Sequence, residues 1–323
     1  MIVLGGNAVL RVHGGALEIE HGSFAERAKL KIDIDEHMPC TILFDGRGEF
    51  ISGEAIRFCA RHSINVIVPD GPGRMCTFIH SALEADDGAS SLPDISPAVI
   101  RAQCAADAVG IAREIVRAKI NAETAFIERR DPFNANAARD WLSKLDEAYT
   151  VPQLIMIEAQ AAMCYWRAFK DMGLREAKGG NLPRSWLRFA NRNKGAQFLG
   201  NKHAAHPVNA MLNYAYVVEA GRLAKALSAR GLALPIGFLH SDKKGRNSLV
   251  WDAIEPLRPT IDANVFGYIG KREFTRRDFP QAGVNTFRLS RNIISAILTD
   301  ARLAERESRR GGLYVALDRT AFQ

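Results

Sequence analysis

EADDGASSLPD, at residues 84–94, is the stretch of this 323-residue chain at which the sequence pattern changes. It is rich in Asp, Ser, Gly and Pro and has no apolar periodicity, which is typical of a linker. The chain before it alternates like β-strands, and the chain after it repeats like helices. We therefore predict an α+β protein with a small N-terminal β-sheet domain (1–83), a linker (84–94) and a larger all-α C-terminal domain (95–323).

On the N-terminal side, the sequence predicts a small sheet with one helix. Residues 8–13 and 16–20 alternate on either side of Gly14-Gly15, which is a strong hairpin signal. Residues 29–34, 41–44, 64–68 and 75–79 read as further strands, and Ile51-Ser52-Gly53-Glu54 opens a short helix. We see no catalytic group of residues here and expect a role in dimerisation or as a scaffold.

Charge is divided unequally between the two sides of the linker. Residues 1–94 contain 8 Lys/Arg against 14 Asp/Glu, whereas the rest of the chain contains 35 against 22. A basic C-terminal domain is typical of a polyanion binder, most often of nucleic acid, although a merely basic helical surface is the alternative. Five scattered cysteines and no long apolar run predict a cytoplasmic protein without a disulfide framework, a zinc site or a membrane span.

On the C-terminal side, the sequence predicts helices at residues 99–128, 135–145, 205–231, 261–269 and 290–307. Another helix begins at Thr150, which forms a capping box with Gln153. Its apolar stripe contains Glu158. A buried carboxylate needs a cation or hydrogen-bond donors, so we expect Glu158 either to pair with an arginine or to bind a metal.

The stretch GFLHSDKKGRNSLVWDAIEPLRP, residues 237–259, contains a polar loop. One histidine precedes the loop and two carboxylates follow it, so the loop can bring the three side chains together. Asp252 and Glu255 are three residues apart and share a helix face. Together with His240 they form a donor set that suits Mn²⁺, or Mg²⁺ where oxygen dominates. The alternative is an ordinary exposed histidine beside a solvated helix face.

Residues 167–202 are strongly basic, with 9 Lys/Arg against 2 Asp/Glu. We predict a helix after Asn181 whose arginines recur every four residues and suit a phosphate backbone, although a solvated face is the alternative. Tyrosines at positions such as 216 more often pack than bind ligands. The candidate DNA-binding residues are Arg184, Arg188, Arg192, Lys194, Lys202, Tyr216, Lys243, Lys244 and Arg246.

Four ordered motifs carry a resemblance to a known family. They are IEAQAA followed by YW (157–166), HPVNAMLNYAY (206–216), PIGFLH (235–240) and SLVWDAIEPLRP (248–259). In this order they resemble the CRISPR-associated adaptation endonuclease/integrase family, and the likeness extends over nearly the whole chain. This resemblance favours a metal site over the alternative of an ordinary histidine beside a solvated helix face.

The resemblance implies a metal-dependent enzyme that inserts short foreign DNA segments into a CRISPR array. It implies Mg²⁺ or Mn²⁺ bound by Glu158, His240 and Glu255, with Asp252 as an adjacent acidic residue, and leaves open which of Asp252 and Glu255 binds closest. It also implies a homodimer, double-stranded DNA as substrate, and a small partner protein of ferredoxin-like fold. Two alternatives remain, a stand-alone structure-selective DNA nuclease and a non-enzymatic DNA-binding scaffold.

Overall fold

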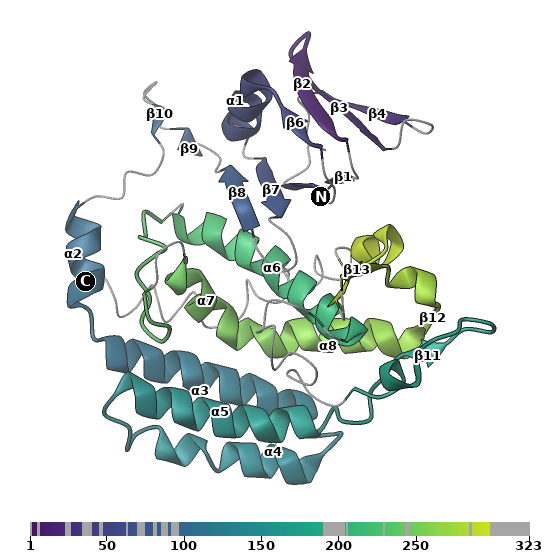
Figure 1. Cartoon of the computed structure of the whole chain (residues 1–323). Helices are drawn as coiled ribbons and strands as arrows, with labels where there is room; N and C mark the ends of the chain where they lie inside the picture. The colour runs from purple at the N-terminus through teal and green to yellow at the C-terminus, as the bar shows by residue number, and fades with distance from the viewer. Residues whose placement is uncertain are drawn as a thin grey trace. The chain divides into compact units, whose positions relative to one another are not determined.

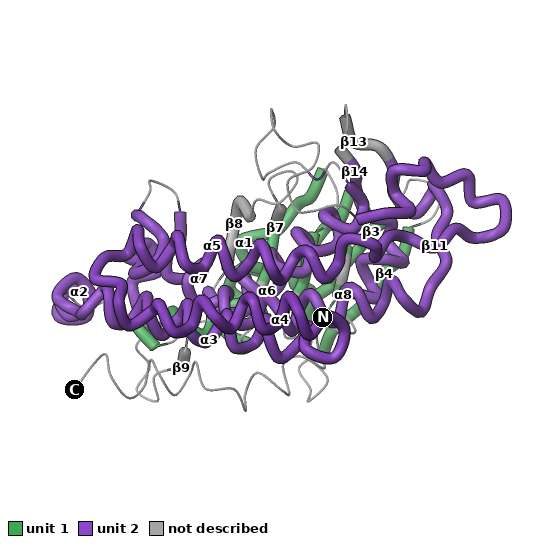
Figure 2. Tube along the Cα trace, turned by 90° about the horizontal axis from the view of Figure 1, so that it is seen from below, with its two compact units in different colours: residues 1–95, 225–231 green, residues 96–224, 232–323 purple. Residues whose placement is uncertain are grey.

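The computed structural model describes residues 2–4, 7–22, 27–33, 41–44, 48–62, 64–69, 75–79, 83–84, 90–91, 97–189, 204, 206–228, 230–242, 246–283 and 286–297. The chain divides into two compact units (Figure 2). Unit 1 comprises Met1–Ile95 with Lys225–Gly231, and unit 2 comprises Ser96–Ala224 with Leu232–Gln323.

Unit 1 contains two four-stranded sheets. In the first, β1 (Ile2–Leu4), β5 (Thr41–Phe44) and β7 (Asn65–Pro69) are parallel, and β8 (Met75–Ile79) is antiparallel to β7. In the second, β2 (Val9–His13), β3 (Ala16–Gly22) and β4 (Arg27–Ile32) are antiparallel, and β6 (Phe50–Ile51) is parallel to β2. The predicted hairpin is present, and Gly14 and Gly15 both have the positive φ that its two-residue turn requires.

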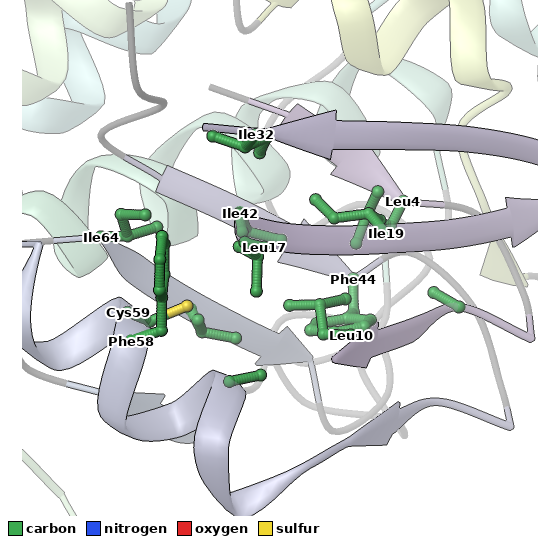
Figure 3. Packing of buried hydrophobic residues seen from close by; sticks show 13 residues of the cluster. Leu4, Leu10, Leu17, Ile19, Ile32, Ile42, Phe44, Phe58, Cys59 and Ile64 are labelled. Atoms are coloured by element: carbon green, nitrogen blue, oxygen red, sulfur yellow. The ribbon is translucent and has the colours of Figure 1, made fainter. Parts of the chain in front are cut away.

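The helix of unit 1, α1 (Gly53–Arg61), begins at Ser52, whose Oγ accepts a hydrogen bond from the Ala55 N–H. It contributes Phe58 and Cys59 to a core that also contains Leu10, Leu17 and Phe44 (Figure 3). Burial raises the pKa of the Cys59 thiol to about 11, so this cysteine stays protonated and acts as a packing residue.

Unit 2 is mainly helical. Its described helices are α2 (Pro97–Ala105), α3 (Ala108–Ile127), α4 (Pro132–Arg139), α5 (Val151–Arg167), α6 (Pro207–Ser228, whose residues 225–228 belong to unit 1), α7 (Ser248–Ile254) and α8 (Arg258–Lys271), and residues 291–297 are also helical. Helices α3, α4 and α5 lie side by side (Figure 1). They enclose a core that contains Val116, Ile120, Leu154 and Ala161.

Two helix predictions in this region were wrong in extent. The predicted helix at 99–128 is two helices, because the Asp107 side chain accepts a hydrogen bond from the Gly110 N–H and starts α3 anew. The predicted helix at 135–145 ends as α4 at Arg139, and a separate 3₁₀ turn, η1 (Leu142–Lys144), follows it. Of the predicted helix at 290–307, residues 298–307 lie outside the described part of the chain.

Short elements complete unit 2. Strand β11 (Arg175–Glu176) pairs in parallel with β12 (Glu273–Phe274), and β13 (Gln281–Gly283) pairs with β14 (Thr286–Phe287). Three further 3₁₀ turns are η2 (Arg184–Trp186), η3 (Glu255–Leu257) and η4 (Arg276–Asp278). A small sheet unit followed by a helix-rich one confirms the α+β prediction. Within the described residues, no helix has the length and apolar character needed to cross a bilayer.

The predicted linker contains a pair of short strands. β9 (Leu83–Glu84) and β10 (Ser90–Ser91) are antiparallel, and the other residues of 84–94 lie outside the described part of the chain. The exact boundaries at 83 and 95 therefore stay predictions.

Candidate metal and DNA site

Helix α5 positions the first candidate ligand. The predicted capping box is present: the Thr150 Oγ1 accepts from the Gln153 N–H, and the Gln153 Oε1 accepts from the Thr150 N–H. Two turns later Glu158 lies on the side of the helix that also carries Leu154 and Ala161, both fully buried. The Glu158 side chain is 21% exposed to solvent, so its carboxylate lies at the edge of the core.

Lys119, on α3, is the partner of Glu158. Its ammonium donates to Glu158 and, over 2.6 Å, to Oε2 of Glu255, while the residue is only 7% exposed. Burial by itself would lower the pKa of Lys119, but Glu255 and Glu158 outweigh that effect and hold it above its ordinary value. Glu158 thus pairs with a lysine in this structure and not with the arginine that the sequence analysis considered. This one cation links two carboxylates from distant parts of the sequence.

Glu255 lies where α7 changes into the η3 turn. The change follows from Pro256, which has no N–H to continue the α-helical bonding. The Arg258 Nε donates to Oε1 of Glu255 over 2.9 Å. Burial raises the pKa of Glu255, but Lys119 and Arg258 together lower it to about 2, so the carboxylate is ionised at neutral pH.

Asp252 is bound on both of its oxygens. Oδ2 accepts from the N–H groups of Phe238 and Leu239, at 2.6 and 3.0 Å, and Oδ1 accepts from the His240 N–H at 2.9 Å. Oδ1 also lies 2.6 Å from Nδ1 of the His240 ring. Gly237 permits this close packing, because a Cβ there would lie 2.7 Å from the Ser248 Cβ.

The two ring nitrogens of His240 face the carboxylates of Asp252 and Glu255. Because Nδ1 faces Asp252, the ring carries its proton there when neutral and leaves the Nε2 lone pair free. Nε2 lies 4.0 Å from Oε1 of Glu255. The structure therefore joins Glu158 and Glu255 through Lys119 and places His240 beside Glu255, with Asp252 at the other ring nitrogen of the histidine.

Glu123 is an acidic residue that the sequence analysis did not single out. It follows Lys119 by one turn of α3 and is 2% exposed. Its Oε2 has no hydrogen-bond partner among the described residues. Burial raises the pKa of Glu123 to about 8, although nearby Lys119 opposes the shift. A cation closer to this carboxylate would favour its ionised form.

A buried tyrosine pair supports the same region. Tyr165 donates to Asp262 over 2.9 Å, and Tyr216 donates to its other oxygen. The guanidinium of Arg258 lies 4.5 Å from the centre of the Tyr216 ring. Tyr216 is 3% exposed, so the structure places this predicted DNA contact inside unit 2, where it serves Asp262 and Arg258.

The predicted arginine helix is absent from the described residues. Residues 184–186 form only the 3₁₀ turn η2, because Asn181 adopts a left-handed conformation and the Leu182 N–H is bound by the Glu176 side chain. Arg184 and Arg188 are exposed, and Arg188 pairs with exposed Asp171. Arg246 is partly exposed, and the candidates outside the described residues are Arg192, Lys194, Lys202, Lys243 and Lys244.

The donor set fits a divalent cation. Two carboxylates and one imidazole nitrogen suit Mn²⁺ and Mg²⁺, and a carboxylate that binds the second ring nitrogen is the usual support of a metal-binding histidine. As the described side chains stand, no three His, Cys, Asp or Glu residues are close enough to hold a metal. The Lys119 ammonium lies between two of the three candidates instead.

Comparison with known sequences identifies the family of the chain. The family model described as CRISPR associated protein Cas1 matches residues 1–302. A Cas4/Cas1 fusion from Rhodospirillum rubrum is 35% identical over 182 residues, which cover 53% of this chain and 29% of that protein. An endonuclease Cas1 from Archaeoglobus fulgidus is 26% identical over 304 residues, covering 86% and 80%. The chain spans about a third of the length of several curated relatives.

Solved structures share the fold. A casposase bound to its integration product superposes with a TM-score of 0.75 at 24% identity, covering 94% of this chain and 82% of that one. A Cas6-RT-Cas1–Cas2 complex gives a TM-score of 0.68 at 18% identity, covering 92% of this chain and 32% of that one.

Proposed function

Because the chain belongs to the CRISPR-associated Cas1 family, we propose that it is a metal-dependent DNA endonuclease and integrase that inserts short foreign DNA segments into a CRISPR array. The observation that carries this proposal is the convergence of Glu158, Glu255 and the free Nε2 of His240. The names of relatives support it: they include endonucleases and a casposase bound to an integration product.

The proposed ligands are Glu158, His240 and Glu255. Asp252 serves as a positioning residue, because its oxygens already accept three backbone N–H groups and face the His240 ring. Arg258 holds the second oxygen of Glu255 and so fixes the direction of that carboxylate. A bound Mg²⁺ or Mn²⁺ would polarise a phosphoryl oxygen and stabilise the leaving alkoxide.

The reaction needs no protein nucleophile. In integration, the 3′-hydroxyl oxygen of the incoming DNA forms a bond to a phosphorus atom of the target and loses its proton. The bond from that phosphorus to the target 3′-oxygen breaks, and the released alkoxide gains a proton. Attack by water at the same phosphorus gives nuclease activity. The protein residues contribute the geometry of the site and the charge around it.

The proposed partners follow the family. We propose double-stranded DNA as the substrate, both as incoming fragment and as repeat array, a homodimer as the working form, and a small ferredoxin-fold adaptation protein as the companion. A solved relative of the same fold is described as a Cas1–Cas2 complex. The proposed phosphate contacts are exposed Arg184 and Arg188, partly exposed Arg246, and Arg192, Lys194, Lys202, Lys243 and Lys244.

Glu158→Ala tests the function. The variant is expected to fold and to bind duplex DNA, but to lose insertion of a short duplex into a repeat-containing plasmid with either Mg²⁺ or Mn²⁺. Glu147→Ala removes an exposed glutamate from the same unit and is the matched control, expected to keep insertion. Near-normal insertion by Glu158→Ala would exclude the assignment, whereas cleavage without insertion by the wild type would favour the stand-alone nuclease.

A further inference from the structure

The position of Lys119 poses a problem of charge. Its ammonium contacts Glu158 and Glu255, two of the three proposed metal ligands. A divalent cation bound by the same two carboxylates would lie beside this positive charge in a buried site. Like charges at such a short distance repel strongly where little water is present. The ammonium and the metal therefore compete for the same oxygens.

A second carboxylate offers the displaced ammonium another position. Glu123 lies four residues after Lys119 on α3, and side chains with this spacing are neighbours on a helix surface. The two residues are 7% and 2% exposed, so both lie on the buried face of the helix. The Oε2 atom of Glu123 has no hydrogen-bond partner among the described residues, which is costly for a buried oxygen.

We propose that Lys119 is a tethered counter-ion that neutralises Glu158 and Glu255 in the metal-free protein and transfers to Glu123 when a divalent cation binds. The inference rests on the proposed metal site and adds a regulatory element to it. The lysine stem is long and flexible, and the ammonium has three donors, so it can exchange one pair of acceptors for another by rotating side-chain bonds.

Two consequences follow from this exchange. In the metal-free protein the ammonium keeps Glu158 paired and gives Glu255 a second cation beside Arg258, so the mutual repulsion of the two carboxylates is neutralised. In addition, the apparent metal affinity depends on the balance between the two positions of the ammonium, and not on the ligands alone. A monovalent cation would attract Glu158 and Glu255 no more strongly than the Lys119 ammonium that it displaces. Competition with Lys119 therefore favours divalent cations.

A double-mutant cycle with Mn²⁺ as the titrant tests the proposal. Removing the competitor with Lys119→Met is expected to tighten the Mn²⁺ Kd, measured by calorimetry, by roughly 5- to 100-fold, the usual range of coupling between sites. It is also expected to lower the Tm of the metal-free protein and to enlarge the rise in Tm on adding Mn²⁺. Lys170→Met, at an exposed lysine of the same unit, is the control and should change neither quantity.

Glu123→Gln tests the second position of the ammonium. The variant is expected to weaken Mn²⁺ binding by roughly 5- to 100-fold, because the displaced ammonium then lacks an acceptor that can release its proton to solvent and become a carboxylate. The Tm without metal should stay within error of the wild type. In the Lys119→Met background the effect of Glu123→Gln should vanish, since no ammonium remains to be received. If Lys119→Met does not fold without metal, Lys119→Gln replaces it in the cycle.

Two results would overturn the proposal. Weaker Mn²⁺ binding by Lys119→Met would show that the lysine organises the ligands and does not compete with the metal. An equal effect of Glu123→Gln in both backgrounds would show that Glu123 acts on the metal directly. Failure of the metal site itself is distinguishable, because the wild type would then bind no Mn²⁺, or Glu158→Ala would bind it as tightly as the wild type.

Discussion

Nδ1 of His240 lies 2.6 Å from Oδ1 of Asp252, and this contact bears on which of Asp252 and Glu255 binds closest to a metal, which the sequence analysis left open. Asp252 faces the backbone of residues 238–240 and the inner side of the ring. Glu255 faces the charged side chains of Lys119 and Arg258 and the Nε2 atom of His240. This division supports the proposal that Glu255 binds the metal and Asp252 orients the histidine.

Replacing Asp252 should affect stability and metal binding together. Asp252→Ala leaves several buried N–H groups without an acceptor, and we expect the free energy of unfolding to fall by about 3–5 kcal/mol. The Mn²⁺ affinity should fall by about 10- to 100-fold as the ring loses its support. Urea denaturation and Mn²⁺ titration measure the two effects. Glu158→Ala should lose Mn²⁺ binding with a much smaller loss of stability, and equal stability losses in both variants would contradict the division of roles.

Tyr165→Phe should destabilise unit 2 without changing its shape. The variant removes one of the hydroxyl donors to buried Asp262, at a cost of about 1–2 kcal/mol in the free energy of unfolding. Tyr149→Phe, at a tyrosine that is 79% exposed, is the matched control. Equal unfolding midpoints in urea for the two variants would show that the Tyr165 hydroxyl contributes nothing.

His206 should make the stability of the protein depend on pH. Burial lowers its pKa to about 4, against the weaker opposing effect of the Ser185 and Arg188 carbonyls. The folded state therefore resists protonation, so stability is complete above about pH 6.5 and decreases as the pH falls from 6.5 towards 4.

The His206→Gln variant isolates this effect. Between pH 7 and pH 4.5 the wild type should lose about 2–3 kcal/mol more of its unfolding free energy than the variant, because the variant has no ring to protonate. Urea titrations of both proteins at the two pH values give the difference. Parallel losses in the two proteins would mean that the acid sensitivity arises elsewhere.

Arg184 and Arg188 should contribute to DNA affinity without sequence preference. Phosphate contacts carry no base information, and replacing both arginines with glutamine should flatten the slope of log affinity against log salt by about 2 units. The exposed pair of Arg188 with Asp171 is weak and leaves the guanidinium available. Arg101→Gln on α2 is the control. An unchanged slope in a folded double variant would identify these two arginines as a solvated surface.

The parts of the fold that could be predicted are those decided by neighbouring residues. The Gly14-Gly15 hairpin and the Thr150–Gln153 capping box depend on contacts within a few residues, and both are present. The break at Asp107 was missed because the apolar repeat continues through it, while the cap acts on one N–H only. The helix expected after Asn181 was wrong because Glu176, outside that segment, holds the Leu182 N–H.

In the candidate site, too, only the features that depend on a local sequence pattern could be predicted. Glu158 was found because a carboxylate interrupts an apolar stripe, and Lys119 and Glu123 interrupt the stripe of Ile115, Val116 and Ile120 in the same way. The same criterion applied to α3 would have identified both. That Lys119 meets Glu158 and Glu255, 39 and 136 residues away, has no local signal at all.

The segment between Ser241 and Ser248 is closed at its base by contacts that do not involve its middle. The Ser248 hydroxyl donates to the Ser241 carbonyl, the Gly237 N–H donates to Asp242, and Asp252 holds residues 238–240. We therefore expect substitutions and insertions around Lys243 and Lys244 to leave the histidine in place. Natural variation, or an engineer who inserts a reporter peptide, could therefore change the proposed phosphate contacts of this segment without changing the proposed metal ligand beside it.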